Sequence, residues 1–357
     1  MLFSSKPQSF GLDLSDLSIK IALLKKTGEH IELASFGRQD VPENVIEGGV
    51  IKKEADLISL IRKTVEDVKG QKINTKFCIV SLPETDSYIR VVQLPRIKKE
   101  EIPEAIKWEL EANIPVPLDE LYFDWQEILR PSSKDSHLDI LIGALPKTLV
   151  DPYLSVIKKA DLNPLAFEIE SVATARALIK DEISADATMI IDLGAKKTTL
   201  VIYADNTVLF TTGLPVSNNE LTSDIAKLLR VDKQKAWDLK VNVGLDESQE
   251  NDKVYRAMEP RLLELVAEIN KYIEYYQVSK LGHAKQNIGK ILLCGGGANL
   301  KGLPAFLSAR LKIGVSIGNP WVNILDPSAE ELPQITFDDS LSYATALGLA
   351  LRGLKGS

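Results

Sequence analysis

The sequence predicts an α/β protein built from two similar halves that face each other across a cleft. The first observation is residues 189–210, where three short apolar runs separated by turns predict an antiparallel meander. The first of these runs ends on Asp192, close to Gly194. The second observation is residues 10–36, which repeat the order of strand, acid, strand, turn and strand, with Asp13 as the acid. Since the whole unit recurs roughly 180 residues later, the pair supports a duplication better than either motif alone.

The bulk composition is typical of a globular protein with an ordinary core. The 357 residues suffice for two or more domains. The 43 basic and 50 acidic residues give a formal charge of −7, which argues against a general nucleic-acid-binding surface. Cys78 and Cys294 both lie in apolar, strand-like runs. Core thiols in a reducing compartment are therefore favoured over a disulfide or a metal site.

The sequence does not predict direct insertion into a membrane. No window approaches the roughly 20 apolar residues of a spanning helix. The N-terminus lacks the apolar segment and cleavage site of a signal peptide. Residues 347–357 are apolar and carry Arg352 and Lys355, a pattern that favours a packed terminal helix over a membrane-surface contact. A cytoplasmic location is therefore expected.

The remaining elements of the first half follow the meander. Residues 54–70 have the apolar spacing of a helix that stops at Gly70, and residues 76–82 predict a buried strand. The next block changes character and predicts a β-α-β-β-α order, which fits a small α+β insertion. Its expected elements are strands at 88–94, 123–129 and 138–145 and helices at 98–113 and 147–160.

The second half is expected to surround the Asp192 meander with helices. A strand at 165–169 and a helix at 171–179 lead into it. Helices at 220–229 and 233–240 precede a long amphipathic helix at 253–279. A strand at 291–293, a helix at 303–311, a strand at 315–317 and a closing helix at 343–354 complete the chain.

These elements divide the chain into four expected subdomains. The first comprises residues 1–83 and is completed by residues 164–185 and 342–357. The insertion comprises residues 84–163. The second half comprises residues 186–226 and 289–341, and residues 227–288 form a helical cap on it.

A glycine-rich turn and two acids carry the candidate chemistry. A carboxylate at a strand end beside a flexible glycine, as at Asp192, suits a hydrated divalent cation next to phosphates. The strand before Cys294 runs into consecutive glycines, where backbone can approach a ligand closely. Taken alone, such a turn more often serves only as a tight turn, and no dinucleotide-type βαβ unit surrounds it. These residues are Gly295, Gly296, Gly297 and Ala298.

Taken together, this spacing resembles the actin, sugar kinase and Hsp70 superfamily, in which duplicated actin-like (ribonuclease H-like) domains enclose a cleft. Asp13 matches the first phosphate motif, Asp192 the second, and the glycine turn the adenosine motif. Within the superfamily the chain is most similar to the PilM family of type IV pilus assembly proteins. The insertion resembles the extra subdomain that this family shares with the division protein FtsA. The supporting stretches are Ser18-Ile19-Lys20, Leu94-Pro95, Trp108-Glu109, Ile114-Pro115, Leu221-Thr222, Asp224-Ile225-Ala226 and residues 343–350.

The resemblance implies an ATP and magnesium site in the cleft. Asp13 and Asp192 would hold magnesium through water, Lys20 would reach the phosphates, and Lys240 would contact the ribose or adenine. Glu170 falls where the superfamily often places a water-orienting, catalytic side chain. A helix-start acid favoured by the macrodipole is an equally open interpretation of Glu170. The other implied cofactor-binding residues are Ser15, Ser18, Gly194, Lys196, Gly295, Gly296, Gly297 and Ala298.

Several residues depart from the family pattern and predict a degenerate site. Ser15 replaces a common glycine, Asp16 a common serine or threonine, and Trp237 a common ribose-binding glutamate. Lys196 stands where a small residue is usual. Asp16 and Lys196 are hypothesised to pair across the cleft and to occupy the phosphate position, where the Asp16 charge would repel phosphate. The chain is therefore expected to be at most a weak ATPase.

The resemblance also implies a scaffold role at the inner membrane. Family members bind the N-terminal cytoplasmic segment of PilN, a single-span membrane protein, within a platform of other pilus proteins. A groove between the first subdomain and the insertion would hold such an extended segment. An active ATPase or small-molecule kinase, an FtsA-like filament former and a type II secretion platform protein remain alternatives. The expected groove residues are Tyr88, Val91, Ile102, Ile106 and Leu110.

Overall fold

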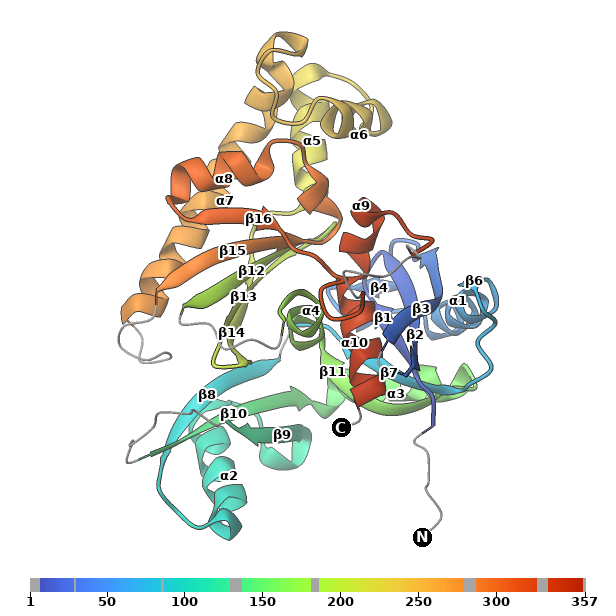
Figure 1. The fold of residues 1–357 in the computed structure, drawn as a ribbon, viewed down its shortest axis with the longest axis vertical. Coiled ribbons are helices and arrows are strands. Elements are labelled where there is room, and N and C mark those ends of the chain that lie inside the picture. Colours follow the sequence, from blue (N-terminus) through green and yellow to red (C-terminus); the bar gives the residue numbers. More distant parts are fainter. Residues whose placement is uncertain are drawn as a thin grey trace.

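The computed structural model describes residues 7–28, 30–84, 87–128, 137–180, 186–278, 287–325 and 333–355. Parts of the predicted segments 164–185, 227–288 and 289–341 lie outside these described residues. Within them, two mixed sheets form the two halves of the molecule, and a smaller three-stranded sheet lies at one end (Figure 1).

The first sheet has the strand order β11-β7-β1-β2-β3-β6. Its meander consists of β1 (Phe10–Leu14), β2 (Ser18–Thr27) and β3 (His30–Asp40), paired antiparallel. β7 (Phe77–Leu82) and β11 (Asn163–Ile169) extend it parallel to β1. The short strand β6 (Lys69–Gly70) pairs with β3 at the other edge of the sheet. The helix predicted over residues 54–70 is therefore shorter: α1 spans Glu54–Glu66, and residues 69–70 belong to the sheet. A small hairpin of β4 (Ile46–Glu47) and β5 (Val50–Ile51) precedes α1.

The second sheet repeats this topology, in the order β14-β13-β12-β15-β16. An antiparallel meander is again extended by two parallel strands next to its first member. The predicted duplication is therefore confirmed at the level of sheet topology. Its strands are β12 (Ala187–Leu193), β13 (Thr198–Ala204), β14 (Thr207–Leu214), β15 (Ile288–Cys294) and β16 (Gly314–Ile317).

Helices α4 (Glu170–Leu178) and α10 (Ala344–Lys355) cross between the two sheets (Figure 1). Their backbones approach so closely that a Cβ at Gly348 would lie 1.8 Å from the carbonyl oxygen of Ala173. The buried hydroxyls of Thr174 and Thr345 lie 2.9 Å apart across the same contact. Small side chains therefore permit this contact, since larger ones would separate the helices.

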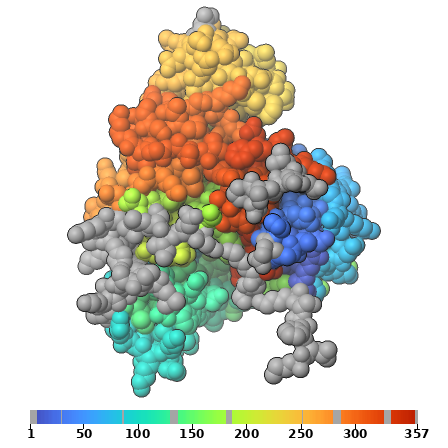
Figure 2. Space-filling model, in the orientation of Figure 1, coloured from blue at the N-terminus to red at the C-terminus, as the bar shows by residue number. Residues whose placement is uncertain are grey.

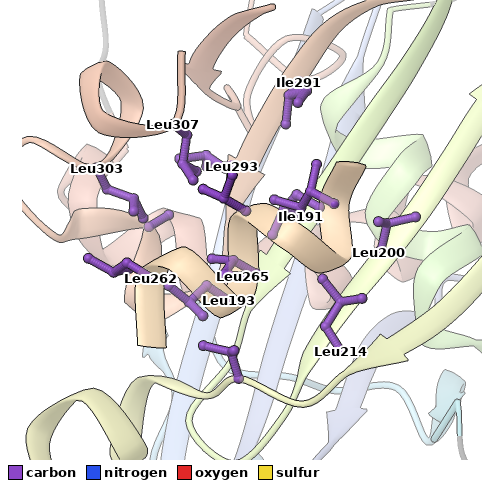
Figure 3. Close-up of a cluster of buried hydrophobic side chains, with 14 of the residues drawn as sticks. Ile191, Leu193, Leu200, Leu214, Leu262, Leu265, Ile291, Leu293, Leu303 and Leu307 are labelled. Carbon is purple, nitrogen blue, oxygen red and sulfur yellow. The ribbon is translucent and has the colours of Figure 1, made fainter. Parts of the chain in front are cut away.

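The second half carries a helical cap, drawn in yellow and orange at one end of the molecule (Figure 2). α5 (Asn218–Leu229), α6 (Lys233–Asn242), a short turn η3 (Glu250–Asp252) and α7 (Lys253–Val278) follow β14. α7 lies across the second sheet, and its apolar stripe packs on strand residues such as Ile191 and Leu293 (Figure 3). The chain then returns through η4 (Gly296–Asn299), α8 (Leu303–Leu311), α9 (Phe337–Ser340) and η5 (Leu341–Tyr343).

The insertion is a three-stranded antiparallel sheet in the order β8-β10-β9, covered by one helix. β8 alternates its side chains between two cores, because Val92 packs in the insertion and Val91 packs on the second half. Its elements are β8 (Tyr88–Pro95), η1 (Lys99–Glu101), α2 (Ile102–Asn113), η2 (Leu118–Glu120), β9 (Leu121–Glu127) and β10 (His137–Pro146).

Helix α3 (Lys147–Lys159) packs differently from the sequence-based expectation, which placed it in the insertion with residues 84–163. Leu149, Tyr153 and Val156 are buried in the core of the first half, together with residues of β1, β2 and α1. The amphipathic pattern predicts that a helix packs one face, but it does not specify which of two neighbouring sheets receives that face.

Candidate functional site

A cleft of about 790 Å³ opens where the two halves meet. The turns that follow β1 and β12 line it from opposite sheets, and the β4–β5 hairpin, the start of α4, the cap and the η5 segment complete it. Both predicted strand-end acids contribute to this lining. Seven other predicted cofactor residues also line it: Ser15, Ser18, Lys20, Gly194, Lys196, Gly295 and Gly296.

Asp13 reaches the cleft as half of a buried ion pair. Asp13 and Lys20 are cross-strand partners in the β1–β2 ladder, and Lys20 Nζ lies 3.2 Å from Asp13 Oδ2. Ser81 donates to the other carboxylate oxygen at 3.1 Å. Lys20 also donates to Ser18 Oγ at 2.8 Å, which leaves one of its three ammonium N–H groups without a side-chain acceptor in the described chain. The Asp13 charge is therefore compensated within the protein.

Asp192 occupies the matching position of the second sheet in a different environment. Its cross-strand partner is Thr199, and the described residues provide no hydrogen bond to its carboxylate. Burial raises the pKa of Asp192 to about 6, and the nearby charge of Glu170 acts in the same direction. This carboxylate is therefore available to a cation or a donor that enters the cleft.

Glycine is required directly beside Asp192. Gly295 has a φ of +79°, and a Cβ there would lie 2.2 Å from Asp192 Oδ1. At Gly296, in contrast, a Cβ would meet nothing within 4 Å. Gly297 and Ala298 do not line the cleft; both are buried, and Gly297 lies against Leu193. Only the first two of the four predicted glycine-turn residues therefore present backbone to the cleft.

The predicted pair of Asp16 with Lys196 is wrong. Both Asp16 carboxylate oxygens accept backbone N–H groups of the β4–β5 hairpin, from Gly48 at 2.8 Å and Gly49 at 2.9 Å. Tyr153 of α3 donates to the Gly49 carbonyl at 2.8 Å and so fixes the same hairpin. Lys196 is exposed and makes no ion pair with any described residue. Two consecutive N–H groups satisfy the Asp16 carboxylate better than an exposed lysine would.

Lys197, the neighbour of Lys196 in the same turn, forms the ion pair across the cleft, although no sequence pattern singles it out. It forms an ion pair with Glu170, the first residue of α4, and so joins the two halves across the cleft. The same Glu170 oxygen accepts the backbone N–H of Glu84 at 3.2 Å. Two adjacent lysines in a turn point in different directions, and spacing alone does not identify the inward one.

Glu84 is a second residue without a sequence signal. It lies just after β7, where the chain leaves the first sheet for the insertion. Ser171 donates to its Oε1 at 3.2 Å, whereas its Oε2 is buried without a hydrogen-bond partner. Burial raises the pKa of Glu84 to about 7, and the charge of Glu170 contributes to the same rise. A carboxyl that titrates near neutral pH therefore lies at this junction.

Lys240 does not reach the cleft as predicted. Its side chain is buried, and its ammonium donates to Asn218 Oδ1 at 2.7 Å and to Thr222 Oγ1 at 2.6 Å. Burial lowers the pKa of Lys240 to about 8. The lysine fixes α6 to the start of α5, while Trp237, one turn earlier, lines the cleft.

The five predicted groove residues do not form an open groove. Ile102, Ile106 and Leu110 are at most 1% exposed and form the core between α2 and its sheet. Val91 packs on the second half, and Tyr88 is partly buried under Arg90. Four of these residues pack within the insertion, and Val91 packs the insertion against the second half.

None of the described helices combines the length and apolar character needed to cross a bilayer. The described part of the chain also holds no group of three or more histidine, cysteine or acidic side chains arranged for a metal.

Solved structures with this fold cover almost the whole chain. A chain of the PilM-PilN type IV pilus biogenesis complex superimposes with a TM-score of 0.80 at 23% identity, covering 99% of this chain and 100% of that one. MreB5 of Spiroplasma citri bound to ADP gives a TM-score of 0.51 at 13% identity, covering 97% and 96%. The actin-like fold is therefore shared.

Sequence comparisons extend the likeness to cell division proteins. FtsA of Buchnera aphidicola subsp. Baizongia pistaciae (strain Bp) is 27% identical over 189 residues, which cover 46% of this chain and 44% of FtsA. The chain spans about half the length of the curated relatives it matches.

The family model for type IV pilus assembly protein PilM matches residues 11–354. This match includes both sheets, the insertion and the cap. The chain belongs to the type IV pilus assembly protein PilM family.

Proposed function

We propose that this chain is an actin-like scaffold of the type IV pilus inner-membrane assembly platform. In this proposal it is cytoplasmic and peripheral to the membrane, and it binds the N-terminal cytoplasmic segment of a PilN-like single-span protein. The observation that supports it most is the whole-length similarity to a chain of the PilM-PilN complex, with the insertion included. Other pilus platform proteins would then contact the same scaffold.

The position of the partner segment needs a different surface from the buried residues of α2. β9 and β11 are edge strands of their sheets among the described residues, and α3 contacts both. Each edge offers unpaired backbone groups, and each exposes an apolar side chain, Tyr122 at 45% and Leu165 at 48%. An extended peptide with apolar side chains would suit this junction of the insertion with the first half.

Isothermal titration with the partner's N-terminal peptide tests the scaffold proposal. The peptide should bind the wild-type chain, and Tyr122→Ser and Leu165→Ser should each weaken binding about fivefold or more. Leu228→Ser is the matched control, because Leu228 is 56% exposed on α5 of the cap. If the folded wild-type chain binds no peptide, the scaffold proposal fails; if only the Leu228 variant loses binding, the proposed position is wrong.

The cleft is proposed to hold a magnesium nucleotide of the ATP type. The volume of about 790 Å³ lies within the range of small-molecule sites. Magnesium is usually held by one or two carboxylates, water and phosphate oxygens, which suits Asp192 with Asp13 beside it. Lys20 and Lys196 would contact phosphate, and Gly295 with Gly296 leaves room for the nucleoside. A bound magnesium nucleotide would supply positive charge to the carboxylates and negative charge to the lysines, and these residues come from both halves.

The proposed nucleotide role is binding with slow turnover at most. Glu170, the predicted catalytic residue, is already engaged by Lys197 and by the Glu84 backbone. A carboxylate with these partners is a weaker base for an attacking water than a free one.

A thermal-shift titration and a radiolabelled-ATP assay test this proposal together. Mg-ATP should raise the melting temperature by several degrees, whereas phosphate release should stay near the uncatalysed rate. No shift at millimolar ATP would reject the nucleotide site, and rapid turnover would reject the assignment of Glu170 to a paired, non-catalytic role.

A further inference from the structure

The cleft walls differ chemically according to the element that supplies them. The β1–β2 and β12–β13 hairpins supply charged groups, such as Lys20, Asp192 and Lys196. The cap supplies Trp237 from α6, beside the side chains at the start of α5. Trp237 is the one aromatic residue among the described residues that line the cleft.

Trp237 is held on a fixed backbone although its side chain is 49% exposed. α6 begins with an Asp232 cap that accepts the Lys235 N–H at 2.8 Å. Ala236 is fully buried, and Lys240 anchors the next turn to α5 through its buried ammonium. The exposure of the indole therefore does not come from a loose helix.

An indole held at the wall of a polar cleft has a specific chemical use. It presents a rigid, flat apolar face that has not been covered by the protein's own core. Nucleobases are flat rings, and stacking on an aromatic side chain is a common way of binding them without base-specific hydrogen bonds. The neighbouring charged groups suit phosphate, so the two kinds of wall match the two parts of a nucleotide.

We propose that Trp237 is the stacking platform for the nucleobase in this cleft, and that it favours purines because their larger ring system covers more of the indole. This inference rests on the proposed nucleotide site. It assigns affinity for the base to Trp237, whereas affinity for the phosphates comes from Lys20 and Lys196.

Intrinsic fluorescence and equilibrium binding test the assignment on the full chain. Mg-ATP should quench tryptophan emission in the wild type, and Trp237→Phe should lose most of that quenching. Trp237→Ala should bind ATP about tenfold more weakly, while its affinity for inorganic tripolyphosphate should be unchanged. Trp237→Phe keeps an aromatic ring, so it should lose less ATP affinity than Trp237→Ala. Trp108→Ala is the control, because Trp108 is 69% exposed on α2 in the insertion.

The outcomes separate this inference from the nucleotide proposal. Loss of ATP affinity with unchanged tripolyphosphate affinity supports the platform. ATP binding that is equally tight in Trp237→Ala overturns it and leaves the nucleotide site standing. Equal loss for ATP and tripolyphosphate also overturns it, because Trp237 would then only shape the cleft. If the wild type binds neither compound, both proposals fail.

Discussion

The two halves carry the same hairpin at the cleft, but they treat its acid differently. In the first half, Asp13 lies across the ladder from Lys20, and the two form a buried ion pair. In the second half, Asp192 lies across from Thr199 and has no such partner in the described chain. One residue at the cross-strand position therefore separates a compensated carboxylate from an available one.

The difference shows that duplicated geometry does not give duplicated chemistry. A buried charge is tolerated when it is paired and hydrogen-bonded, as at Asp13. An unpaired buried carboxylate has a raised pKa, as at Asp192, and a nearby cation would stabilise its ionised form. The first half supplies a fixed charge pair at the cleft, and the second supplies a carboxylate without an ion-pair partner in the described chain.

The largest predicted effect is that of Asp13→Asn compared with Asp192→Asn. Asp13→Asn leaves the Lys20 ammonium buried without its counter-charge, so it should lower the free energy of unfolding by about 3–5 kcal/mol. Asp192→Asn removes an uncompensated charge and should change it by less than about 1 kcal/mol, or raise it. Urea unfolding without nucleotide and magnesium measures both. Equal losses in the two variants would contradict the contrast between the halves.

The next effect concerns the backbone beside Asp192. Gly295→Ala places a methyl 2.2 Å from Asp192 Oδ1 at a positive φ, and it should cost about 2–3 kcal/mol of stability. Gly296→Ala is the matched control, since its Cβ would meet nothing within 4 Å and should cost about 0.5 kcal/mol or less. The check is thermal and urea unfolding of both variants. A cost at Gly296 as large as at Gly295 would show that the turn is rigid for another reason.

Between the halves, Glu84 predicts a pH effect of intermediate size. Its pKa is raised from 4.5 to about 7 by burial, with Glu170 and Lys197 facing it and Ser171 bonded to it. The folded state favours the neutral carboxyl. The contribution of Glu84 to the free energy of unfolding is therefore complete below about pH 4.5 and is lost as the pH rises through 7.

Glu84→Gln replaces the carboxyl with an amide that stays neutral at every pH. It should remove about 2 kcal/mol of the fall in unfolding free energy between pH 5 and 8. Unfolding curves at several pH values for the wild type and this variant give the difference directly. Parallel pH profiles for the two chains would mean that Glu84 is ionised in the folded protein.

The smallest predicted effect on stability is at the surface of the cleft. Lys196 is exposed, and Lys196→Ala should change the free energy of unfolding by less than about 0.5 kcal/mol. Its affinity for Mg-ATP should still fall severalfold, because a phosphate contact would be lost. Lys53→Ala, another exposed lysine, is the control for affinity. Unchanged ATP affinity in Lys196→Ala would remove this lysine from the proposed site.

Much of the fold could be predicted from local patterns. Each half begins with strands whose alternation and turns are explicit in the sequence, and the long α7 carries a clear apolar stripe. The strand-end acids could also be found, because the turn places them at the edge of a sheet. The likeness between the halves made each of these interpretations stronger.

The errors came where a side chain has two possible partners in space. Asp16 was predicted to pair with Lys196, but the β4–β5 hairpin provides two backbone donors to its carboxylate instead. The apolar face of α2 could have lined a groove, but three strands cover it. Non-local packing decides such cases, and a pattern within one element does not contain it.

The path of the chain out of the insertion limits how this domain could be inherited or exchanged. β10 passes directly into α3 at Pro146, with no connecting loop, and α3 completes the core of the first half. A cassette cut at residues 84 and 163 would remove Tyr153 and the other core residues of α3 from their host. A transferable module would therefore have to end at Pro146, so that α3 stays with the first half.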